Sequence, residues 1–302
     1  MANEMHALNR CAPNACSTQS GVAAATVVLA AVLIGVSPVA AQTTPKPSGA
    51  QIEIAYVQPL NPIYRPIHDR LQQRKVLEIL QEFLAPLNLP RTLLVKVNEC
   101  GSSSARYKPQ GPVTICYEYI EQIRRLAPRS TVQLVQGRIS ADSAIVGPFV
   151  QAVLREVAIA TFDMFDVPVW GRLDDAADRV AAFIMLQFGP AVAWYTIVGS
   201  AWFLSASTGT SADYSDVRGL VAQRYYTTLC VALGSEQRQE FERFVGKEAA
   251  GNLPEDRAQV CPEEYDALKQ GFNATLTPHI DKQKLARVRS VNWLKVLTAE
   301  RN

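Results

Sequence analysis

The sequence predicts an α+β fold, with a small sheet near the N-terminus followed by a mostly helical body. Three observations predict the α+β class. The segments predicted as strands are short, rich in β-branched residues and lie within residues 51–119. From about residue 147, apolar side chains recur at helical spacing in one segment after another. The chain has 302 residues, is 48% hydrophobic and 19% charged, and shows no internal repeat, as in an ordinary globular protein.

The elements follow in chain order. Strands are predicted at QIEIAYV (51–57), RTLLVKVNE (91–99) and PVTICYEY (112–119), the last running into a short helix that ends at Leu126. One helix is predicted over residues 66–85, where Pro86 stops it. Further helices are predicted at about 147–165, 173–188, 191–206, 216–233, 235–247 and 261–273.

The first 41 residues have the pattern of a signal peptide. The apolar run GVAAATVVLAAVLIGV (21–36) precedes SPVAAQ, in which Val39 and Ala41 occupy the small-residue positions before a cut. We expect cleavage between Ala41 and Gln42 and a periplasmic or secreted protein. The alternative is a membrane anchor formed by residues 21–41, although the apolar run is shorter than the ~20 residues that a span needs.

After this segment, QTTPKPSGA (42–50) is a polar linker, and residues 51–277 are predicted to form one domain. Removing residues 1–41 takes away one Arg and one Glu, so the net charge stays at +2 and nothing indicates nucleic acid binding. The basic segment 278–302 is a C-terminal helix or tail. We expect its apolar side to dock on the domain; the alternative is an arm for an acidic partner or a membrane surface.

The cysteines also favour export. Cys11 and Cys16 leave with the signal peptide, and an even number remains. Cys100 and Cys116 flank a Gly/Ser/Pro-rich stretch that is typical of a hairpin loop, whereas Cys230 ends one helix and Cys261 opens the next. The spacing predicts the disulfides Cys100–Cys116 and Cys230–Cys261; the alternative is four free thiols in a reducing compartment.

The segment Arg155-Glu156-Val157-Ala158-Ile159 has the frame of a zinc-protease helix without its histidines. In an HExxH helix the two histidines lie four residues apart on one face, and the Glu between them activates the zinc-bound water. Here Arg155 and Ile159 stand at the two histidine positions, and Asp174 follows Arg155 by nineteen residues.

The chain resembles a bacterial zinc-metallopeptidase family of unknown function, which is gluzincin-like and carries HExxH. The similar segments, in order, are ECG (99–101) with SARYKP (104–109), ICYEYI (115–120), REVAI (155–159) with DVPVWGRLDDAAD (166–178), VRGLVAQRYYTTLCVALGS (217–235) and RAQVCPEEY (257–265). The resemblance covers about residues 51–275 and implies that the mostly helical body is zincin-like. It implies the same disulfide partners that the spacing predicts.

The departures from this family decide the functional prediction. The resemblance implies zinc ligands at Arg155, Ile159 and Asp174, where the family has His, His and Glu, and a general base at Glu156. Arg cannot lose its proton to bind a metal, and Ile has no donor atom. We therefore expect no zinc, no other cofactor and a vestigial Glu156. A further family His is Arg218 here.

The resemblance also implies a substrate-binding edge at Ser104 and Ala105, where the family has Asn and Ala. The histidines of the mature chain, His68 and His279, have no partner at ligand spacing, and we expect both to be exposed structural residues. Trp170 is predicted to anchor a loop.

Loss of a dication would leave several carboxylates close together, which is costly in a partly buried cleft. We therefore predict that the Arg155 guanidinium replaces the metal by pairing with Asp174 or Asp178, with Asp175 and Arg218 as further candidates for ion pairing. The alternative is that Arg155 points to solvent. Ile159 is predicted to refill the site with apolar core, together with Leu154, Ala158 and Phe162.

Three functions are compatible with these residues. The first is a degenerate, non-catalytic peptidase homologue that binds a peptide or protein partner, which predicts a cleft still open beside residues 102–110. The second is a hydrolase that uses Glu156 with Asp174 or Asp178, or an unrecognised metal site, which requires paired carboxylates in an open pocket with a raised pKa. The third is a purely structural periplasmic protein, which predicts a filled cleft.

Overall fold

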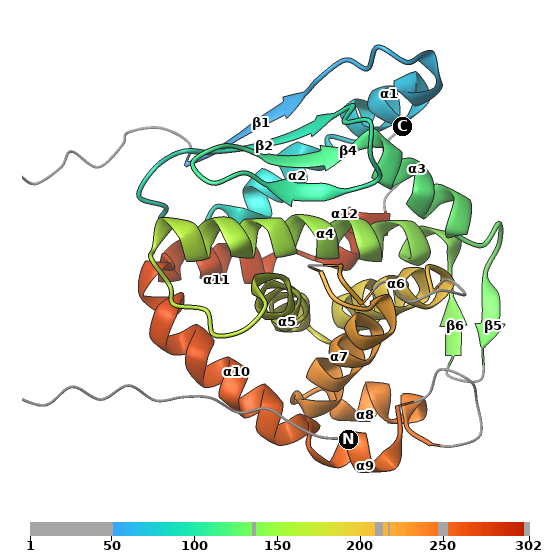
Figure 1. The fold of residues 1–302 in the computed structure, drawn as a ribbon, viewed down its shortest axis with the longest axis vertical. Coiled ribbons are helices and arrows are strands. Elements are labelled where there is room, and N and C mark those ends of the chain that lie inside the picture. The colour runs from blue at the N-terminus through green and yellow to red at the C-terminus, as the bar shows by residue number, and fades with distance from the viewer. Residues whose placement is uncertain (1–50, 135–136, 209–213, 217, 247–252, 299–302) are drawn as a thin grey trace, which may run out of the picture. The chain divides into compact units, whose positions relative to one another are not determined.

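A computed structural model of the chain describes residues 51–134, 137–208, 214–216, 218–246 and 253–298 (Figure 1). The expected signal peptide and linker lie outside these residues. The elements in chain order are β1 (Ile52–Tyr56), η1 (Pro62–Tyr64), α1 (Arg65–Gln73), α2 (Val76–Leu84), β2 (Leu93–Asn98), β3 (Ala105–Tyr107), β4 (Val113–Cys116), α3 (Tyr117–Leu126), β5 (Val132–Leu134), β6 (Gly137–Ile139), α4 (Ala141–Met164), α5 (Leu173–Met185), η2 (Leu186–Phe188), α6 (Pro190–Ala206), α7 (Val221–Gly234), α8 (Arg238–Phe241), η3 (Glu242–Phe244), α9 (Glu255–Gln259), α10 (Cys261–Thr275), η4 (Thr277–His279), α11 (Lys282–Ser290) and α12 (Trp293–Thr298).

The predicted α+β class is confirmed, because one small mixed sheet lies against a body of helices (Figure 1). The strand order is β1-β2-β4-β3, with β1, β2 and β4 parallel and β3 antiparallel to β4. In β2, Leu93, Val95 and Val97 are buried while the residues between them are half-buried, as expected for a strand with one face on the core. Because β3 stands at one end of this strand order, it is an edge strand.

Helix α4 is the central element of the body and runs beneath the sheet, with α5 and α6 on its other side (Figure 1). Ser140 caps its start by accepting from Ser143 N at 3.0 Å. By length and composition α4 is long and apolar enough to cross a membrane, but 83% of its most apolar stretch is buried inside the protein. That burial is typical of a core helix.

Two glycines allow α4 and α6 to approach closely. A Cβ added to Gly199 would lie 1.9 Å from Ser143 O, and one added to Gly147 would lie 2.5 Å from Thr196 O. Neither position has room for a side chain, so the crossing of the two helices depends on the absence of a Cβ.

The structure differs from the expected elements in several places. The helix expected over 66–85 is two helices, because Lys75 adopts a left-handed conformation with φ of 52°. The break brings Leu77 N within 2.7 Å of the Tyr56 hydroxyl that accepts from it. Strand β3 lies inside the stretch expected to be loop, and the hairpin β5–β6 and the short helix α9 have too few residues to show a periodicity.

The C-terminal segment docks on the domain as two short helices, α11 and α12, where one was expected. Val288 and Trp293 are buried, and the Trp293 ring packs edge-on against Phe83 at 5.2 Å between centroids. Its indole Nε1 donates to Val288 O at 2.6 Å. The apolar side chains of the segment therefore contact the domain, and Arg287 and Arg289 are solvated.

Both predicted disulfides are confirmed. Cys100 is bonded to Cys116 and Cys230 to Cys261, with Cα–Cα distances of 5.5 and 5.1 Å. The first joins the end of β2 to the end of β4, and the second joins α7 to the start of α10. Both indicate an oxidising, extracytoplasmic environment.

Candidate functional site

The segment Arg155-Glu156-Val157-Ala158-Ile159 lies in the second half of α4, and Arg155 and Glu156 contact strand β3. Arg155 and Glu156 are nearly inaccessible, with side chains 5% and 3% exposed. Such burial of two charged side chains is tolerated only where each one is paired and hydrogen-bonded. Their partners therefore define the site.

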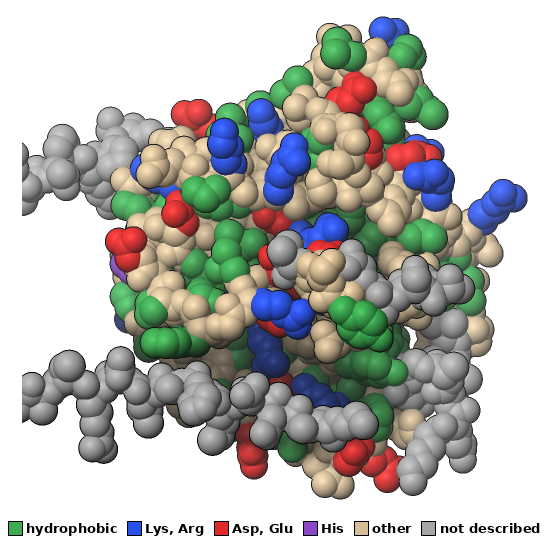
Figure 2. Space-filling view, in the orientation of Figure 1, with side chains coloured by type: hydrophobic (Ala, Val, Ile, Leu, Met, Phe, Trp, Pro, Cys, Tyr) green, Lys and Arg blue, Asp and Glu red, His purple; other side chains and the backbone are tan. Residues whose placement is uncertain are grey.

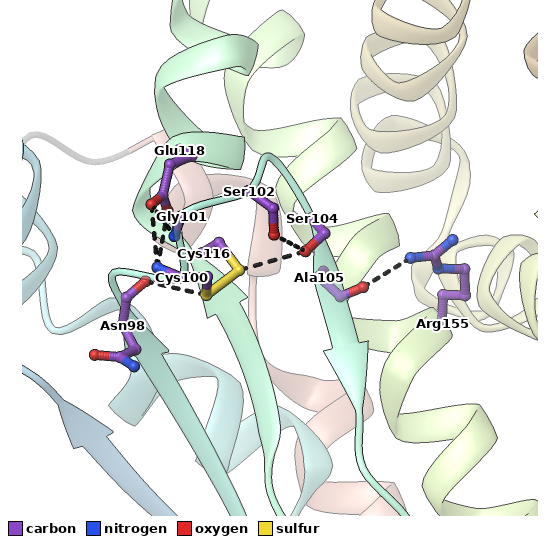
Figure 3. Close-up of a disulfide and its surroundings, with 9 residues drawn as sticks. All are labelled: Asn98, Cys100, Gly101, Ser102, Ser104, Ala105, Cys116, Glu118 and Arg155. Carbon is purple, nitrogen blue, oxygen red and sulfur yellow. Dashed lines mark hydrogen bonds between the residues drawn. A yellow bond between two sulfur atoms is a disulfide. The ribbon is translucent and has the colours of Figure 1, made fainter.

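The Arg155 guanidinium bridges two carboxylates from different helices. Its Nη2 lies 2.5 Å from Glu156 Oε1, and its Nη1 lies 3.3 Å from Asp174 Oδ1 at the start of α5. Nη2 also donates to the Ala105 carbonyl of β3 at 3.3 Å, and Figure 3 shows the guanidinium reaching from α4 toward that oxygen. A fixed cation thus lies between the carboxylates that the resemblance assigns to a zinc site.

The same ion pair occupies the open edge of β3. Tyr107 N donates to Glu156 Oε2 at 2.5 Å, while Ala105 O accepts from Arg155. On the other side of the strand, Ser104 O accepts from Cys116 N of β4. Because successive residues alternate direction, Ala105 O and Tyr107 N are the groups that an added strand would pair with. The Arg155–Glu156 pair thus occupies the hydrogen-bonding positions that such a strand would use at these two residues.

Burial raises the pKa of Glu156 above its usual value, while the charge of Arg155 and the bond from Tyr107 N act in the opposite direction. Burial also raises the pKa of Asp174, again opposed by Arg155. Both oxygens of Glu156 already accept hydrogen bonds, and its side chain is only 3% exposed, so this carboxylate is poorly placed to contact a substrate.

The other acidic and basic candidates pair elsewhere. Asp178 does not contact Arg155; it accepts from Arg224 of α7 at 2.6 Å and 3.1 Å in a bidentate pair. Burial lowers the pKa of Arg224, but the charge of Asp178 outweighs this and raises it overall. Arg224 was not predicted as a site residue. Its only sequence signal is its place in QRYY, within the segment 217–235 that resembles the family.

Two half-buried candidates, Asp175 and Arg218, form local pairs. Asp175 lies 2.8 Å from Arg172 in the preceding turn. Arg218 pairs with Asp216 at 3.3 Å. It makes no ion pair with Glu156, Asp174 or Asp178, so the expected ion pair with the carboxylates of α4 or α5 is wrong. Its charge nevertheless lowers the pKa of Asp174 slightly, after the larger effects of burial, Arg155, Asp178 and Arg224.

A cleft of about 790 Å³ lies over this ion pair, between β3 and the helices. It is lined by Ser102, Ser103, Ser104, Ala105, Arg106, Tyr107, Pro109, Arg155, Glu156, Ile159, Phe162, Asp163, Val167, Val169, Leu173, Asp174, Asp216 and Arg218. Figure 2 shows acidic, basic and apolar side chains together in the centre of this face. The wall from β3 (the polar wall) carries the hydroxyls of Ser102, Ser103 and Ser104, and the wall from α4, the loop after it and α5 (the apolar wall) carries apolar side chains around the charged residues.

Ile159 belongs to the apolar wall. It packs with Phe162 and Ala158 but stays half-buried, so the position that the resemblance assigns to a ligand is only partly filled with core. Trp170, in the loop that supplies this wall, is 94% exposed. The prediction that it anchors the loop is therefore wrong.

The polar wall is held in place by the first disulfide. Figure 3 shows Ser102 and Ser104 beside the sulfur atoms of Cys100 and Cys116 at the start of β3. The hydroxyls of the two serines are 3.3 Å apart, and Ser104 Oγ is 3.5 Å from Cys116 Sγ. Both residues predicted for the substrate edge, Ser104 and Ala105, line the cleft, but the Ala105 carbonyl is already bound by Arg155.

A second network closes the far end of the polar wall. The Tyr107 hydroxyl donates to Asp163 Oδ2 at 2.6 Å and accepts from Arg91 Nη2 at 2.7 Å. The bond from Tyr107, more than the charge of Arg91, lowers the pKa of Asp163. No sequence pattern indicates this network, because its members are far apart in the chain.

The residues present do not fit a catalytic zinc. Arg155 and Ile159 offer no lone pair, and both carboxylates of the site bind the guanidinium instead. Within the described part of the chain, the one close group of three ligand-type residues is Cys100, Cys116 and Glu118. Its sulfurs are joined in a disulfide, so it presents no thiolate pair for a metal.

Neither histidine lies at the cleft. His68 is buried at 8% exposed, which corrects the expectation that it is an exposed residue. Its Nδ1 lies 2.8 Å from Asp69 Oδ1, and its ring meets Tyr117 edge-on. His279 is half-buried and stacks on Phe165 at 3.7 Å. Both have structural partners.

Comparison with known proteins gives one match. Residues 56–276 match the model of a protein family whose description is "Putative metallopeptidase". No curated protein and no solved structure matches the chain.

Proposed function

Since the chain belongs to the family described as putative metallopeptidases, which residues 56–276 match, we propose that it is a non-catalytic, exported member that binds peptides in the cleft beside β3. One observation carries the proposal. The Arg155 guanidinium bridges Glu156 and Asp174 at 2.5 and 3.3 Å, where the reaction of the relatives needs a metal ion and a free base.

The two alternatives have less support. Catalysis by paired carboxylates requires that one of them touch a substrate, whereas Glu156 is 3% exposed and has both oxygens bonded. A purely structural role predicts a filled cleft, whereas about 790 Å³ is open over the ion pair. An open cleft with an inactive centre favours binding.

The walls of the cleft indicate the kind of ligand. Ile159, Phe162 and Leu173 form an apolar surface that suits large apolar side chains, opposite the hydroxyls of Ser102 and Ser104. The edge of β3 at Ala105 and Tyr107 is already bonded. The ligand is therefore held by its side chains, without adding a strand at these two residues.

Two observations support export. The apolar run 21–36 followed by Ala41-Gln42 has the pattern of a cleaved signal peptide. Both disulfides require an oxidising compartment. We place the protein in the periplasm or outside the cell, where peptides are available as ligands.

A binding experiment tests this function on protein recovered after export from cells that express the full chain. The probe is a fluorescein-labelled decapeptide of Gly and Ser with a central Phe-Leu pair, compared with the same peptide carrying Ala-Ala. Fluorescence polarisation is expected to show binding of the first peptide that is at least tenfold tighter. Mass spectrometry is expected to find both peptides intact.

A matched pair of variants locates the binding site. Leu173 and Val260 are both 42% exposed, but only Leu173 lines the cleft. Replacing Leu173 by Ser is expected to weaken peptide binding roughly tenfold through lost apolar contact, and Val260→Ser is expected to leave it unchanged. Cleavage of the peptide, equal binding of both peptides, or equal effects of the two variants would contradict the proposal.

A further inference from the structure

A second cavity, separate from the cleft, lies where α2, α5 and α10 meet the C-terminal segment. Its volume is about 310 Å³. The walls carry two aromatic pairs, Phe83 with Phe188 at 4.4 Å and Phe183 with Phe272 at 4.8 Å between ring centroids, and Leu285 of α11. Pockets for small organic ligands are about 300–1,000 Å³ and mostly apolar, so both the size and the lining suit a ligand.

The C-terminal wall of this cavity is held by the backbone. Asn88 N donates to His279 O and Asp281 N donates to Pro86 O, both at 2.8 Å. Ile280 also forms a bridge with Leu87. These bonds fix the segment against the end of α2, so the cavity does not depend on a ligand to order it.

The charges at the cavity are all of one sign. Lys282 and Arg289 line it, and no acidic residue is among the described residues that do so. The Lys282 side chain makes no hydrogen bond or ion pair within the described part of the chain, and within the same residues the Arg289 side chain donates only to Gln187 Oε1 at 3.4 Å. The neighbouring Asp281 is engaged elsewhere, because it caps α11 by accepting from Gln283 N and Lys284 N.

We propose that this cavity binds a free long-chain carboxylate. The alkyl tail lies among the phenylalanine rings and Leu285, and the carboxylate lies at the rim beside Lys282 and Arg289. A carboxylic acid is ionised at neutral pH, so it supplies the negative charge that the rim lacks. Two solvated cations favour it over an uncharged or cationic molecule with the same tail.

Calorimetric titration of the exported protein tests the site, with dodecanoate as probe and dodecan-1-ol and dodecyltrimethylammonium as tail-matched controls. Dodecanoate is expected to bind one to one, roughly tenfold tighter than the alcohol, and the cation is expected not to bind. Shortening the tail to decanoate is expected to weaken binding by roughly fourfold per methylene removed.

Charge variants on one helix provide the matched control. The double variant Lys282→Ala/Arg289→Ala is expected to reduce dodecanoate binding to the level of the alcohol while leaving alcohol binding unchanged. Lys284→Ala/Arg287→Ala removes the same charge from α11 at residues that do not line the cavity, and is expected to have no effect. Absence of dodecanoate binding, equal binding of the alcohol, or equal losses in both double variants would overturn the proposal; the first of these would also result if a segment of this chain filled the cavity.

Discussion

Replacing Arg155 by Met tests the ion pair most sharply, because Met keeps the length and apolar stem of the side chain but removes its charge. Arg155, Glu156 and Asp174 have side chains 5%, 3% and 20% exposed, so the variant leaves one buried and one half-buried carboxylate without the guanidinium that pairs with them. Breaking a buried pair in this way costs about 3–5 kcal/mol. We therefore expect the free energy of unfolding at pH 7 to fall by about that amount.

The dependence on pH distinguishes this cause from lost packing. Burial already raises the pKa of Glu156 and Asp174, and Arg155 opposes the rise. Without Arg155 both rise further, so the folded variant holds a proton that the unfolded chain, with ordinary carboxyl groups, has lost. Its stability then increases as the pH falls from 7 toward 5, by up to about 1.4 kcal/mol per pH unit for each such proton.

The assay is urea unfolding followed by circular dichroism at pH 7 and pH 5, with the disulfides kept oxidised. Arg172→Met is the control, because Arg172 and its partner Asp175 are 45% and 39% exposed. It is expected to lose less than about 1 kcal/mol at either pH. The triple variant Arg155→Met/Glu156→Gln/Asp174→Asn is expected to recover most of the loss at pH 7. A loss below 1 kcal/mol, or one that does not change with pH, would refute the reasoning.

Two further predictions concern stability. Replacing Cys230 and Cys261 by Ser removes a link across 31 residues and is expected to lower the free energy of unfolding by about 3–4 kcal/mol; free thiols in the native protein would contradict the pairing. Gly199→Ala would place a Cβ 1.9 Å from Ser143 O, so we expect a loss of about 1–3 kcal/mol in thermal unfolding. Gly271→Ala meets no atom within 4 Å in α10 and is expected to gain about 0.5–1 kcal/mol; the reverse order of the two alanine variants would be inconsistent with the proposed helix crossing.

Much of the fold was predictable because long segments carry their own periodicity. Helices α5, α6 and α10 lie within a few residues of their predicted bounds, and both disulfides follow from spacing and export. Short elements were not predictable. Strand β3 has three residues, and it is a strand because it pairs with β4, not because of any local sequence pattern.

The site was predictable in its chemistry but not in its partners. That Arg155 and Ile159 cannot bind zinc follows from the residue types alone. The sequence could not assign Asp178 to Arg224 in place of Arg155, because that choice depends on the packing of α5 on α7. Nor could it reveal that Glu156 bonds Tyr107 N, since the edge of β3 is created only by the sheet order.

Zinc binding by equilibrium dialysis tests most directly whether the guanidinium has replaced the metal. The wild type should be compared with the variant Arg155→His/Ile159→His/Asp174→Glu, which restores two histidines at helical spacing and a longer carboxylate. Hydrolysis of casein with and without a chelator should be measured in parallel.

We expect well below one tightly held zinc per chain and no hydrolysis in the wild type, and about one zinc per chain in the variant. One zinc per wild-type chain, lost on Glu156→Gln/Asp174→Asn and accompanied by chelator-sensitive hydrolysis, would contradict the replacement.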